Sequence, residues 1–284
     1  MIVVTGATGH LGRLVVESLL KKVHAGQVAA VARNPDKAKD LATRGVEVRR
    51  GDYSNPETLR SALAGAEKLL FISSSEVGQR AAQHAAVVDA AKAAGVKLLV
   101  YTSILRAETS RIALAAEHKA TEAAIRASGV PFVFLRNGWY LENYTENLAP
   151  ALQHGAIVGT ANGGRIAAAA RADYAEAAVA VLTGSPGKQV YELAGDHPFT
   201  MAELAAEVSR QAGKPIEYRD LPPEQYRAVL TSAGLPGAIA DLYVDADVQA
   251  ARGDLDDSTG ELRRLIGRPT TPLSAAVRPA SAHA

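Results

Sequence analysis

The 284-residue chain contains no cysteine. This absence excludes disulfide bonds, thiolate metal sites, iron–sulfur clusters and a cysteine nucleophile. The seven histidines are scattered along the chain, and no two of them have the spacing of zinc ligands. We therefore expect no metal site.

Neither sign of charge predominates, because the chain has 31 basic and 30 acidic residues and a net charge of +1. No basic stripe runs along the chain, so nucleic acid is not an expected partner. No stretch approaches the roughly 18 uninterrupted apolar residues of a membrane span, which argues against a membrane protein. Met1 leads directly into an apolar run without the basic segment of a secretory signal. We expect a cytoplasmic protein.

Short apolar runs alternate with alanine-rich stretches of helical period over about the first 135 residues. Hydrophobic residues make up 48% of the chain, enough for one large domain, or one large and one small. Runs without polar alternation suit strands that are buried on both faces of a parallel sheet. The pattern predicts an α/β protein with a doubly wound parallel sheet. The predicted strands cover residues 2–5, 27–32, 46–49, 68–73, 97–102 and 131–135.

The pattern changes after Trp139, where helices dominate and strand signals are sparse, at 156–159, 189–193 and 216–221. A capping box at residues 200–203 predicts the start of a helix. We expect a Rossmann-like domain over 1–139 and a smaller helix-rich C-terminal lobe over 140–277. This lobe is not independent if a segment near 165–171 returns to the main sheet. Residues 278–284 have no apolar pattern and are predicted to be a mobile tail.

A glycine-rich turn lies between the first predicted strand and the first predicted helix. Gly6 allows a tight turn, Gly9 lets the backbone approach a diphosphate, and Gly12 lets the helix pack closely on the strand. The diphosphate would rest on the N–H groups at the helix start. The alternative is a merely structural turn. The pattern favours a Rossmann-like site for a dinucleotide, with contacts from Gly6, Ala7, Thr8, Gly9, His10 and Leu11.

Arg33 ends the second predicted strand, where NAD-binding proteins usually carry an Asp or Glu that accepts from the ribose 2′-hydroxyl. A guanidinium can instead clamp a 2′-phosphate and has no acceptor for a hydroxyl. The cofactor is therefore predicted to be NADP(H). The alternative is a solvated arginine at a strand end.

Further polar residues follow the third and fourth predicted strands, at the same edge of the sheet. Asp52 could accept a hydrogen bond from the adenine amino group, or belong to a helix N-cap region before Pro56. The hydroxyls of Ser73, Ser74 and Ser75 could approach the ribose and phosphates of the cofactor. Together these positions indicate a cofactor site more strongly than any one alone.

The chain resembles the NmrA-like group of atypical short-chain dehydrogenase/reductases, and within it the bacterial NADPH-dependent quinone oxidoreductases, with triphenylmethane reductases as near relatives. The resemblance extends over nearly the whole chain. It lies in TGATGHLG at 5–12, VARNP at 31–35, ISSSEVGQR at 72–80, LRNGWY at 135–140, YELAG at 191–195 and LIGRPT at 265–270.

This resemblance implies further cofactor contacts near the other end of the site. They are Asn137, Gly138, Trp139, Tyr140, Leu141, Glu142 and Asn143, together with Arg171. By chemistry alone, Arg171 could equally be a surface arginine or a partner of Asp173. Trp139 offers a flat surface to a planar acceptor, or packs two lobes together. Asn137 could bind a carbonyl or the nicotinamide carboxamide.

The Tyr-x-x-x-Lys pair of most short-chain dehydrogenases is missing, because no tyrosine has a lysine four residues later. His118 and Glu122 occupy the expected places, one helical turn apart. His118 could protonate a product, or be a surface histidine paired with Glu122. The absence argues against alcohol–ketone interconversion, where a developing alkoxide needs a positioned acid.

Quinone reduction has less need of a positioned proton donor, because the acceptor is electrophilic and takes hydride directly from nicotinamide. The predicted function is an NADPH-dependent quinone oxidoreductase. Alternatives are a reductase of another planar acceptor, such as a triphenylmethane dye, and a non-catalytic NADP-sensing regulator of the NmrA kind. Nothing in the sequence indicates an oligomeric state.

Overall fold

The computed structural model describes residues 1–278 and divides the chain into two compact units. The first unit contains Met1–Glu108, Ala116–Asn137 and Arg171–Leu193. The second contains Thr109–Ala115, Gly138–Ala170 and the chain from Ala194 onward. Neither unit is continuous in sequence, and each is described by itself below. Apart from Arg278, the tail predicted at 278–284 lies outside the described residues.

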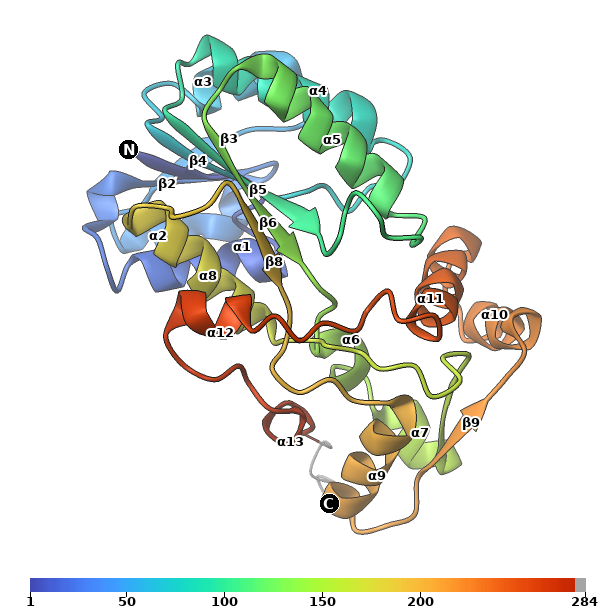
Figure 1. Cartoon of the computed structure of the whole chain (residues 1–284). Helices are drawn as coiled ribbons and strands as arrows, with labels where there is room; N and C mark the ends of the chain where they lie inside the picture. Colours follow the sequence, from blue (N-terminus) through green and yellow to red (C-terminus); the bar gives the residue numbers. More distant parts are fainter. Residues whose placement is uncertain (279–284) are drawn as a thin grey trace. The chain divides into compact units, whose positions relative to one another are not determined.

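The first unit is built on a seven-stranded parallel sheet of order β3-β2-β1-β4-β5-β6-β8 (Figure 1). This order reverses direction at β1, as in a doubly wound sheet, and confirms the predicted fold class. The six predicted strands are all present. The strands are β1 (Ile2–Val4), β2 (Val28–Ala32), β3 (Glu47–Arg50), β4 (Lys68–Phe71), β5 (Leu98–Ile104), β6 (Phe132–Asn137) and β8 (Val190–Leu193).

The last strand of this sheet corrects the expectation for the C-terminal half. The segment near 165–171 forms no strand of the sheet, and Arg171 instead begins a helix. The strand signal at 189–193 becomes β8, which pairs in parallel with β6. The chain thus returns to the main sheet about 20 residues later than expected, through a complete helix and strand, since a parallel neighbour requires such a crossover.

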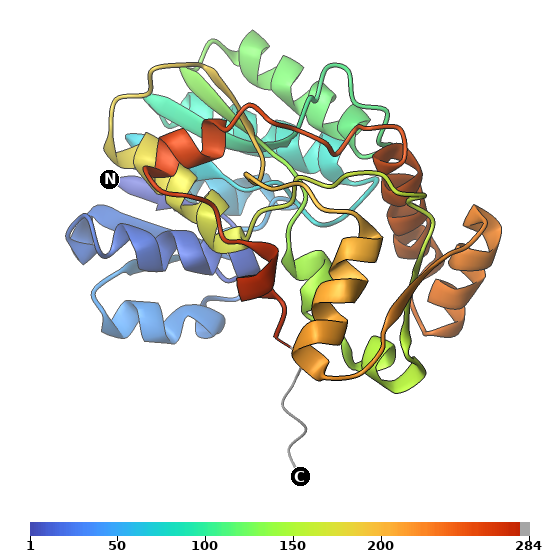
Figure 2. The same ribbon diagram turned by 60° about the horizontal axis from the view of Figure 1, so that its bottom comes forward.

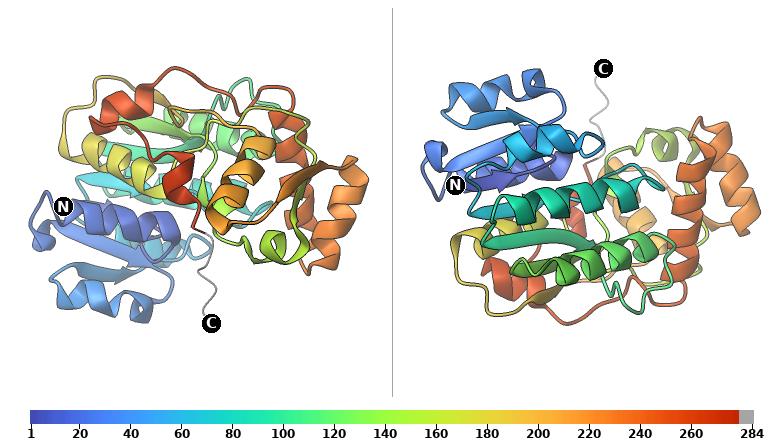
Figure 3. Two further views of the ribbon diagram at one scale, coloured as in Figure 1. Left: turned by 90° about the horizontal axis from the view of Figure 1, so that it is seen from below. Right: turned by 90° about the horizontal axis from the view of Figure 1, so that it is seen from above.

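Apolar side chains fill both faces of the sheet. On β4, Leu69 and Phe71 belong to one buried cluster, whereas Leu70 is equally buried on the opposite face. Successive side chains of a strand point to opposite faces, so a continuous apolar run needs cover on both. Figure 1 shows α3, α4 and α5 over one face and α1 and α8 over the other, and Figure 3 gives both views. The helices of this unit are α1 (His10–Leu19), η1 (Ala25–Gln27), η2 (Pro35–Ala38), α2 (Lys39–Thr43), α3 (Pro56–Ala62), α4 (Arg80–Ala93), α5 (Ala115–Ser128) and α8 (Arg171–Thr183).

The second unit is rich in helices and carries a two-stranded parallel sheet, β7 (Ala156–Gly159) with β9 (Glu217–Asp220). The predicted capping box opens α9: Thr200 Oγ1 accepts from the Glu203 N–H at 3.1 Å, and Glu203 Oε2 accepts from the Thr200 N–H at 2.7 Å. Figure 2 shows α9 beside β9. The helices are α6 (Glu142–Thr145), α7 (Ala149–His154), α9 (Met201–Ala212), α10 (Pro223–Ser232), α11 (Gly237–Ala250), α12 (Glu261–Ile266) and α13 (Leu273–Ala276).

Within residues 1–278, the helices are all too short or too polar to cross a bilayer. The same residues contain no cluster of three or more histidine and carboxylate side chains placed to hold a metal ion.

Candidate cofactor site

The glycine turn between β1 and α1 is held in place by backbone contacts. Gly6 has a φ of +61°, which favours glycine, and its carbonyl accepts from the Gly9 N–H at 2.9 Å. The Ala7 N–H donates to the Val31 carbonyl at 3.1 Å, which ties the turn to β2. A Cβ on Gly12 would lie 2.2 Å from the Gly6 carbonyl oxygen. The start of α1 and the turn therefore approach each other so closely that no side chain fits at Gly12.

A cavity of about 420 Å³ opens at this turn, at the carboxyl edge of the sheet in the first unit. The helix N-terminus in its wall has no side-chain cap, so its partial positive charge is available to a diphosphate. The lining residues come from the glycine turn, from the end of β2, from the segments that follow β2, β3 and β4, and from α4. They are Gly6, Thr8, Gly9, His10, Leu11, Gly12, Val31, Ala32, Arg33, Lys37, Gly51, Asp52, Tyr53, Ile72, Ser73, Ser74, Ser75, Glu76 and Gln83.

The structure thus brings most of the cofactor residues predicted for this edge together. The exception is Ala7, which is fully buried and acts by holding the turn rather than by lining the cavity. Arg33 lines the cavity with its side chain 67% exposed, and its Nη1 lies 2.5 Å from Glu76 Oε1. Lys37 adds a second cationic side chain in the same wall.

Asp52 lines the cavity, but one of its oxygens serves a local turn. Its Oδ1 accepts from the Ser54 N–H at 2.9 Å, while the N-cap of α3 is Asn55. Beside it, the Tyr53 hydroxyl lies 2.6 Å from Thr5 Oγ1 and 2.7 Å from the Ile72 carbonyl. Burial raises the pKa of Tyr53, so the phenol stays protonated and joins the ends of β1, β3 and β4.

The serine segment after β4 is held from behind by side chains of neighbouring elements. Thr102 Oγ1 accepts from the Ser73 N–H at 2.9 Å, and His84 Nε2 accepts from the Ser74 N–H at 3.0 Å. Arg80 Nε donates to the Ser74 carbonyl at 2.6 Å. These contacts fix the backbone while the segment itself lines the cavity.

The residues that the family resemblance added are divided between the units. Asn137 ends β6 in the first unit, and among the described residues its buried Oδ1 has no hydrogen-bond partner. Arg171 begins α8, also in the first unit. Gly138 through Asn143 belong to the second unit, where the Leu141 N–H donates to the Ala169 carbonyl. Cofactor contacts by these residues stay a prediction.

His118 lies inside the first unit and is only 4% exposed. Its Nδ1 lies 2.8 Å from the Tyr101 hydroxyl, and burial lowers its pKa to about 3. The alternative of a surface histidine paired with Glu122 is wrong, because Glu122 accepts from Ser103 Oγ at 2.6 Å and pairs with Arg136 at 2.7 Å. The catalytic role of His118 stays a prediction, and a neutral, buried imidazole gives it no support.

The burial of His118 leads to a prediction about acid stability. The folded state excludes a proton that the unfolded chain accepts below its ordinary pKa of 6.5, so the free energy of unfolding falls as pH drops from 6.5 toward 3. One such proton contributes a slope of about 1.4 kcal/mol per pH unit. For His118→Asn, we expect a profile shallower by about this slope between pH 6 and 4, measured by urea unfolding.

The control for removing a histidine is His197→Asn, at an exposed position in the second unit. His84, whose pKa is also lowered to about 3, stays in place in both variants and keeps its own contribution. If the His118→Asn and wild-type profiles were parallel, His118 would not be the source of the acid sensitivity. Unchanged kcat in the same variant would remove the predicted catalytic role.

Among the residues that line the cofactor cavity, Lys37, Glu76 and Gln83 carry charged or amide side chains that sequence reasoning did not assign to the site. Lys37 could have been found, because it lies only four residues after Arg33, in the short helix η2 that follows β2. Glu76 follows the serines at the same edge of the sheet and entered only as part of a family motif. Gln83 lies on α4 and carries no sequence signal, because only the packing of α4 brings it to the cavity.

The second unit contains a cavity of about 200 Å³ whose lining is mostly apolar and includes several polar side chains. Asp247 is one of them: its Oδ2 accepts from the Thr160 N–H at 3.0 Å, and burial raises its pKa to about 6. Tyr144 lines the cavity too, and its hydroxyl has no partner among the described residues. The lining residues are Asn143, Tyr144, Asn147, Leu148, Pro150, Ala151, Ala156, Ile157, Val158, Met201, Leu204, Tyr226, Tyr243 and Asp247.

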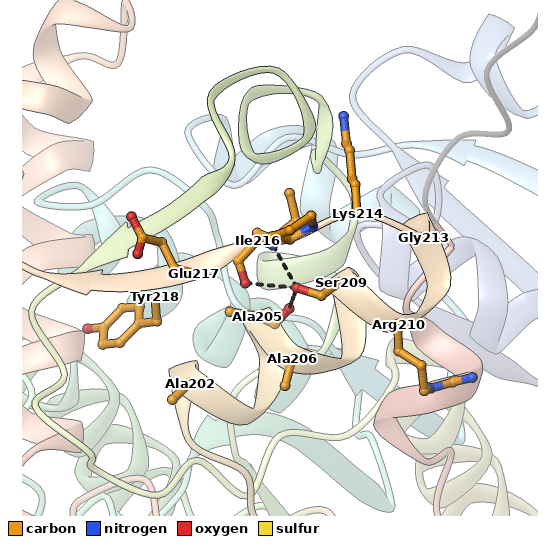
Figure 4. A pocket seen from close by; sticks show the side chains of 11 residues that line it. Ala202, Ala205, Ala206, Ser209, Arg210, Gly213, Lys214, Ile216, Glu217 and Tyr218 are labelled. Atoms are coloured by element: carbon orange, nitrogen blue, oxygen red, sulfur yellow. Dashed lines mark hydrogen bonds between the residues drawn. The ribbon is translucent and has the colours of Figure 1, made fainter.

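A wider hollow of about 690 Å³ lies between α9 and β9 in the same unit (Figure 4). Its serine is already engaged, because Ser209 Oγ accepts from the Ile216 N–H and lies 2.9 Å from the Ala205 carbonyl. Figure 4 shows the side chains of Arg210, Lys214 and Glu217 pointing away from one another. No set of polar groups converges in this hollow, so it is not a candidate site.

The doubly wound sheet, the glycine turn and the cation at the end of β2 define a dinucleotide-binding α/β protein. The chain belongs to the NmrA-like family, whose model matches residues 1–265.

The relatives cover nearly the whole chain. Quinone oxidoreductase 2 of Escherichia coli K12 is 52% identical over 279 residues, which cover 98% of this chain and 97% of that protein. The crystal structure of the NADPH-dependent quinone oxidoreductase of E. coli complexed with NADPH superposes with a TM-score of 0.93 at 52% identity, covering 96% of this chain and 97% of that one. Triphenylmethane reductase of Citrobacter sp., complexed with NADP(H), has a TM-score of 0.94 at 42% identity and covers 98% and 99%.

Proposed function

We infer that this chain is an NADPH-dependent quinone oxidoreductase, which transfers a hydride from nicotinamide to a quinone. The observation that carries the inference is the cavity of the first unit, where an uncapped helix start and Arg33 lie at the same edge of the sheet. The full-length likeness to quinone oxidoreductase 2 of E. coli supports the same reaction.

The cavity fits NADPH in both charge and shape. The glycine turn and the first turn of α1 would hold the diphosphate, because Gly9 lets the backbone approach it and Gly12 keeps the helix start close to the turn. Arg33 would hold the 2′-phosphate by charge-assisted hydrogen bonds. The buried Oδ1 of Asn137, which has no partner among residues 1–278, can accept a hydrogen bond from a ligand donor such as a carboxamide. When bound, the cofactor supplies the hydride.

The chain's residues orient the reactants and supply no evident acid. Two electrons and one proton reach the quinone as hydride, and the resulting hydroquinone anion takes its second proton from water. This balance needs no positioned donor, which agrees with the missing Tyr-x-x-x-Lys pair and with the neutral, buried His118. The cytoplasmic location stays a prediction.

The cavity of the second unit is the site we propose for the acceptor ring. Its apolar lining suits an aromatic ring, and the Tyr144 hydroxyl is a donor suited to a ring oxygen. Its volume of about 200 Å³ lies below the roughly 300 Å³ at which pockets for larger ligands begin. The size favours a single-ring quinone over a triphenylmethane dye with three rings.

We expect Ala151→Phe to raise the KM for a simple quinone by about tenfold, because the new ring fills space that the acceptor needs. Ala151 lines the cavity and is 7% exposed. The measurement is initial-rate kinetics at saturating NADPH, with the Kd for NADPH determined separately and expected to stay unchanged. Ala206→Phe places the same side chain in the hollow between α9 and β9 and is the matched control. Equal KM values for the two variants would remove the acceptor assignment.

The reaction itself is tested by following NADPH absorbance with a simple quinone, with a triphenylmethane dye and without acceptor. Saturating, quinone-dependent oxidation is the expected result. Oxidation with the dye alone would identify a dye reductase instead. Measurable NADP+ binding without oxidation by either acceptor would identify a regulator that senses the cofactor.

A further inference from the structure

An ion pair spans the cofactor cavity at the end of β2. Arg33 Nη1 lies 2.5 Å from Glu76 Oε1, and both residues line the cavity. Glu76 comes from the segment after β4, 43 residues further along the chain. Because β1 lies between β2 and β4 in the sheet, the two side chains reach toward each other across the end of β1. The guanidinium predicted to bind a 2′-phosphate is thus already bound to a carboxylate.

The Glu76 carboxylate is oriented by a second contact rather than by the ion pair alone. Its Oε2 accepts from Gln83 Nε2 at 2.7 Å, and its backbone N–H donates to Ser74 Oγ at 3.1 Å. Gln83 is 6% exposed and lies on α4, so it holds the carboxylate from the buried side. Because both carboxylate oxygens of Glu76 are already held by neighbours, its side chain loses less conformational entropy on binding a ligand than a mobile surface glutamate would.

This placement gives Glu76 opposite effects on the two nicotinamide cofactors. The 2′-phosphate of NADPH must replace the carboxylate on Arg33, and any remaining proximity of the two anions is repulsive. NADH carries a 2′-hydroxyl there, which can donate to a carboxylate. Strand β2 lacks the acidic residue that usually accepts this bond, and Glu76 offers one from the loop after β4.

We propose that Glu76 determines how strongly the chain discriminates between NADPH and NADH, by competing with the 2′-phosphate for Arg33 and by accepting from the 2′-hydroxyl. The proposal rests on the proposed function, because it takes the cavity of the first unit as the cofactor site. Glu76 weakens NADPH binding and supports NADH binding, so the wild-type chain retains measurable affinity for NADH.

The test is Glu76→Gln, which keeps the length of the side chain and an oxygen for Gln83 but removes the charge. We expect the Kd for NADP+ to fall by about twofold to fivefold and the Kd for NAD+ to rise by a similar factor, the range of an exposed charge interaction. Isothermal titration calorimetry on the intact chain measures both constants. The effect on NADP+ is expected to shrink in high salt, because the competing interaction is ionic.

The matched control is Glu217→Gln, which neutralises an exposed glutamate paired with Arg219 on β9 of the second unit. It is expected to change neither constant. A wild-type chain that binds NADP+ while Glu76→Gln leaves the NADP+/NAD+ ratio unchanged would overturn this proposal alone. Weaker binding of both NADP+ and NAD+ by a similar factor would also overturn it, since that result indicates general damage to the cavity. A wild-type chain that fails to bind NADP+ would overturn the proposed cofactor site as well.

Discussion

Arg33→Asp is expected to raise the KM for NADPH by about 100-fold while changing the KM for NADH by less than about fivefold. The substitution removes a charge-assisted interaction of about 1.5–3 kcal/mol with the 2′-phosphate and adds a repulsive carboxylate. For NADH, the aspartate supplies the acceptor that the 2′-hydroxyl of the ribose usually finds at the end of the second strand. Steady-state kinetics with one quinone and both cofactors measures the two effects.

The control for this charge change is Arg210→Asp, on the exposed surface of α9 in the second unit. It alters the net charge of the protein by the same amount. A difference in KM between the two variants therefore comes from the location of Arg33 in the cavity and not from the change in net charge. Equal increases in KM for NADPH and NADH would contradict the assignment of Arg33 to the 2′-phosphate.

Gly12→Ala is expected to weaken NADPH binding by at least about 100-fold and to lower the free energy of unfolding by about 1–3 kcal/mol. The added Cβ would lie 2.2 Å from the Gly6 carbonyl oxygen and 2.9 Å from the Ala7 Cα. Both are backbone atoms, so the turn that approaches the diphosphate has to move. Fluorescence titration with NADPH and thermal unfolding measure the two losses.

Alanine ordinarily stabilises a helix by about 1 kcal/mol relative to glycine, so a loss of stability at Gly12 would show that crowding dominates. Gly26→Ala is the matched control, because a Cβ there meets nothing within 4 Å. It is expected to leave NADPH binding unchanged. Near wild-type NADPH affinity in Gly12→Ala would contradict the proposed contact between turn and diphosphate.

The elements that sequence predicted well are those specified by local patterns. Apolar runs such as β4 and β5 are buried on both faces, and any other environment would leave their side chains in water. The capping box at Thr200 and Glu203 likewise specifies a helix start from four consecutive residues. β8 was assigned to the wrong environment because its four residues carry no information about which strand they pair with.

Within the candidate site, some residues are likewise specified by local sequence patterns, whereas the surroundings of others depend on tertiary packing. Arg33 could be placed at the cofactor edge because a strand end and a glycine turn are read directly from the sequence. The environment of His118 was misjudged, because helical spacing brings it near Glu122 whereas packing of α5 on β5 buries it against Tyr101. Two partners of Glu122, Ser103 and Arg136, come from β5 and β6, which spacing along one helix does not reveal.

The sequence by itself determined the doubly wound sheet, the glycine turn and the cationic end of β2, because each depends on residues that are neighbours along the chain. Only the tertiary structure decided that Glu76 faces Arg33, that Gln83 orients it, and that the second unit encloses a small apolar cavity. These features depend on the order of strands in the sheet and on the packing of helices. Contacts between residues tens of positions apart arise from that packing, and periodicity in the sequence does not encode them.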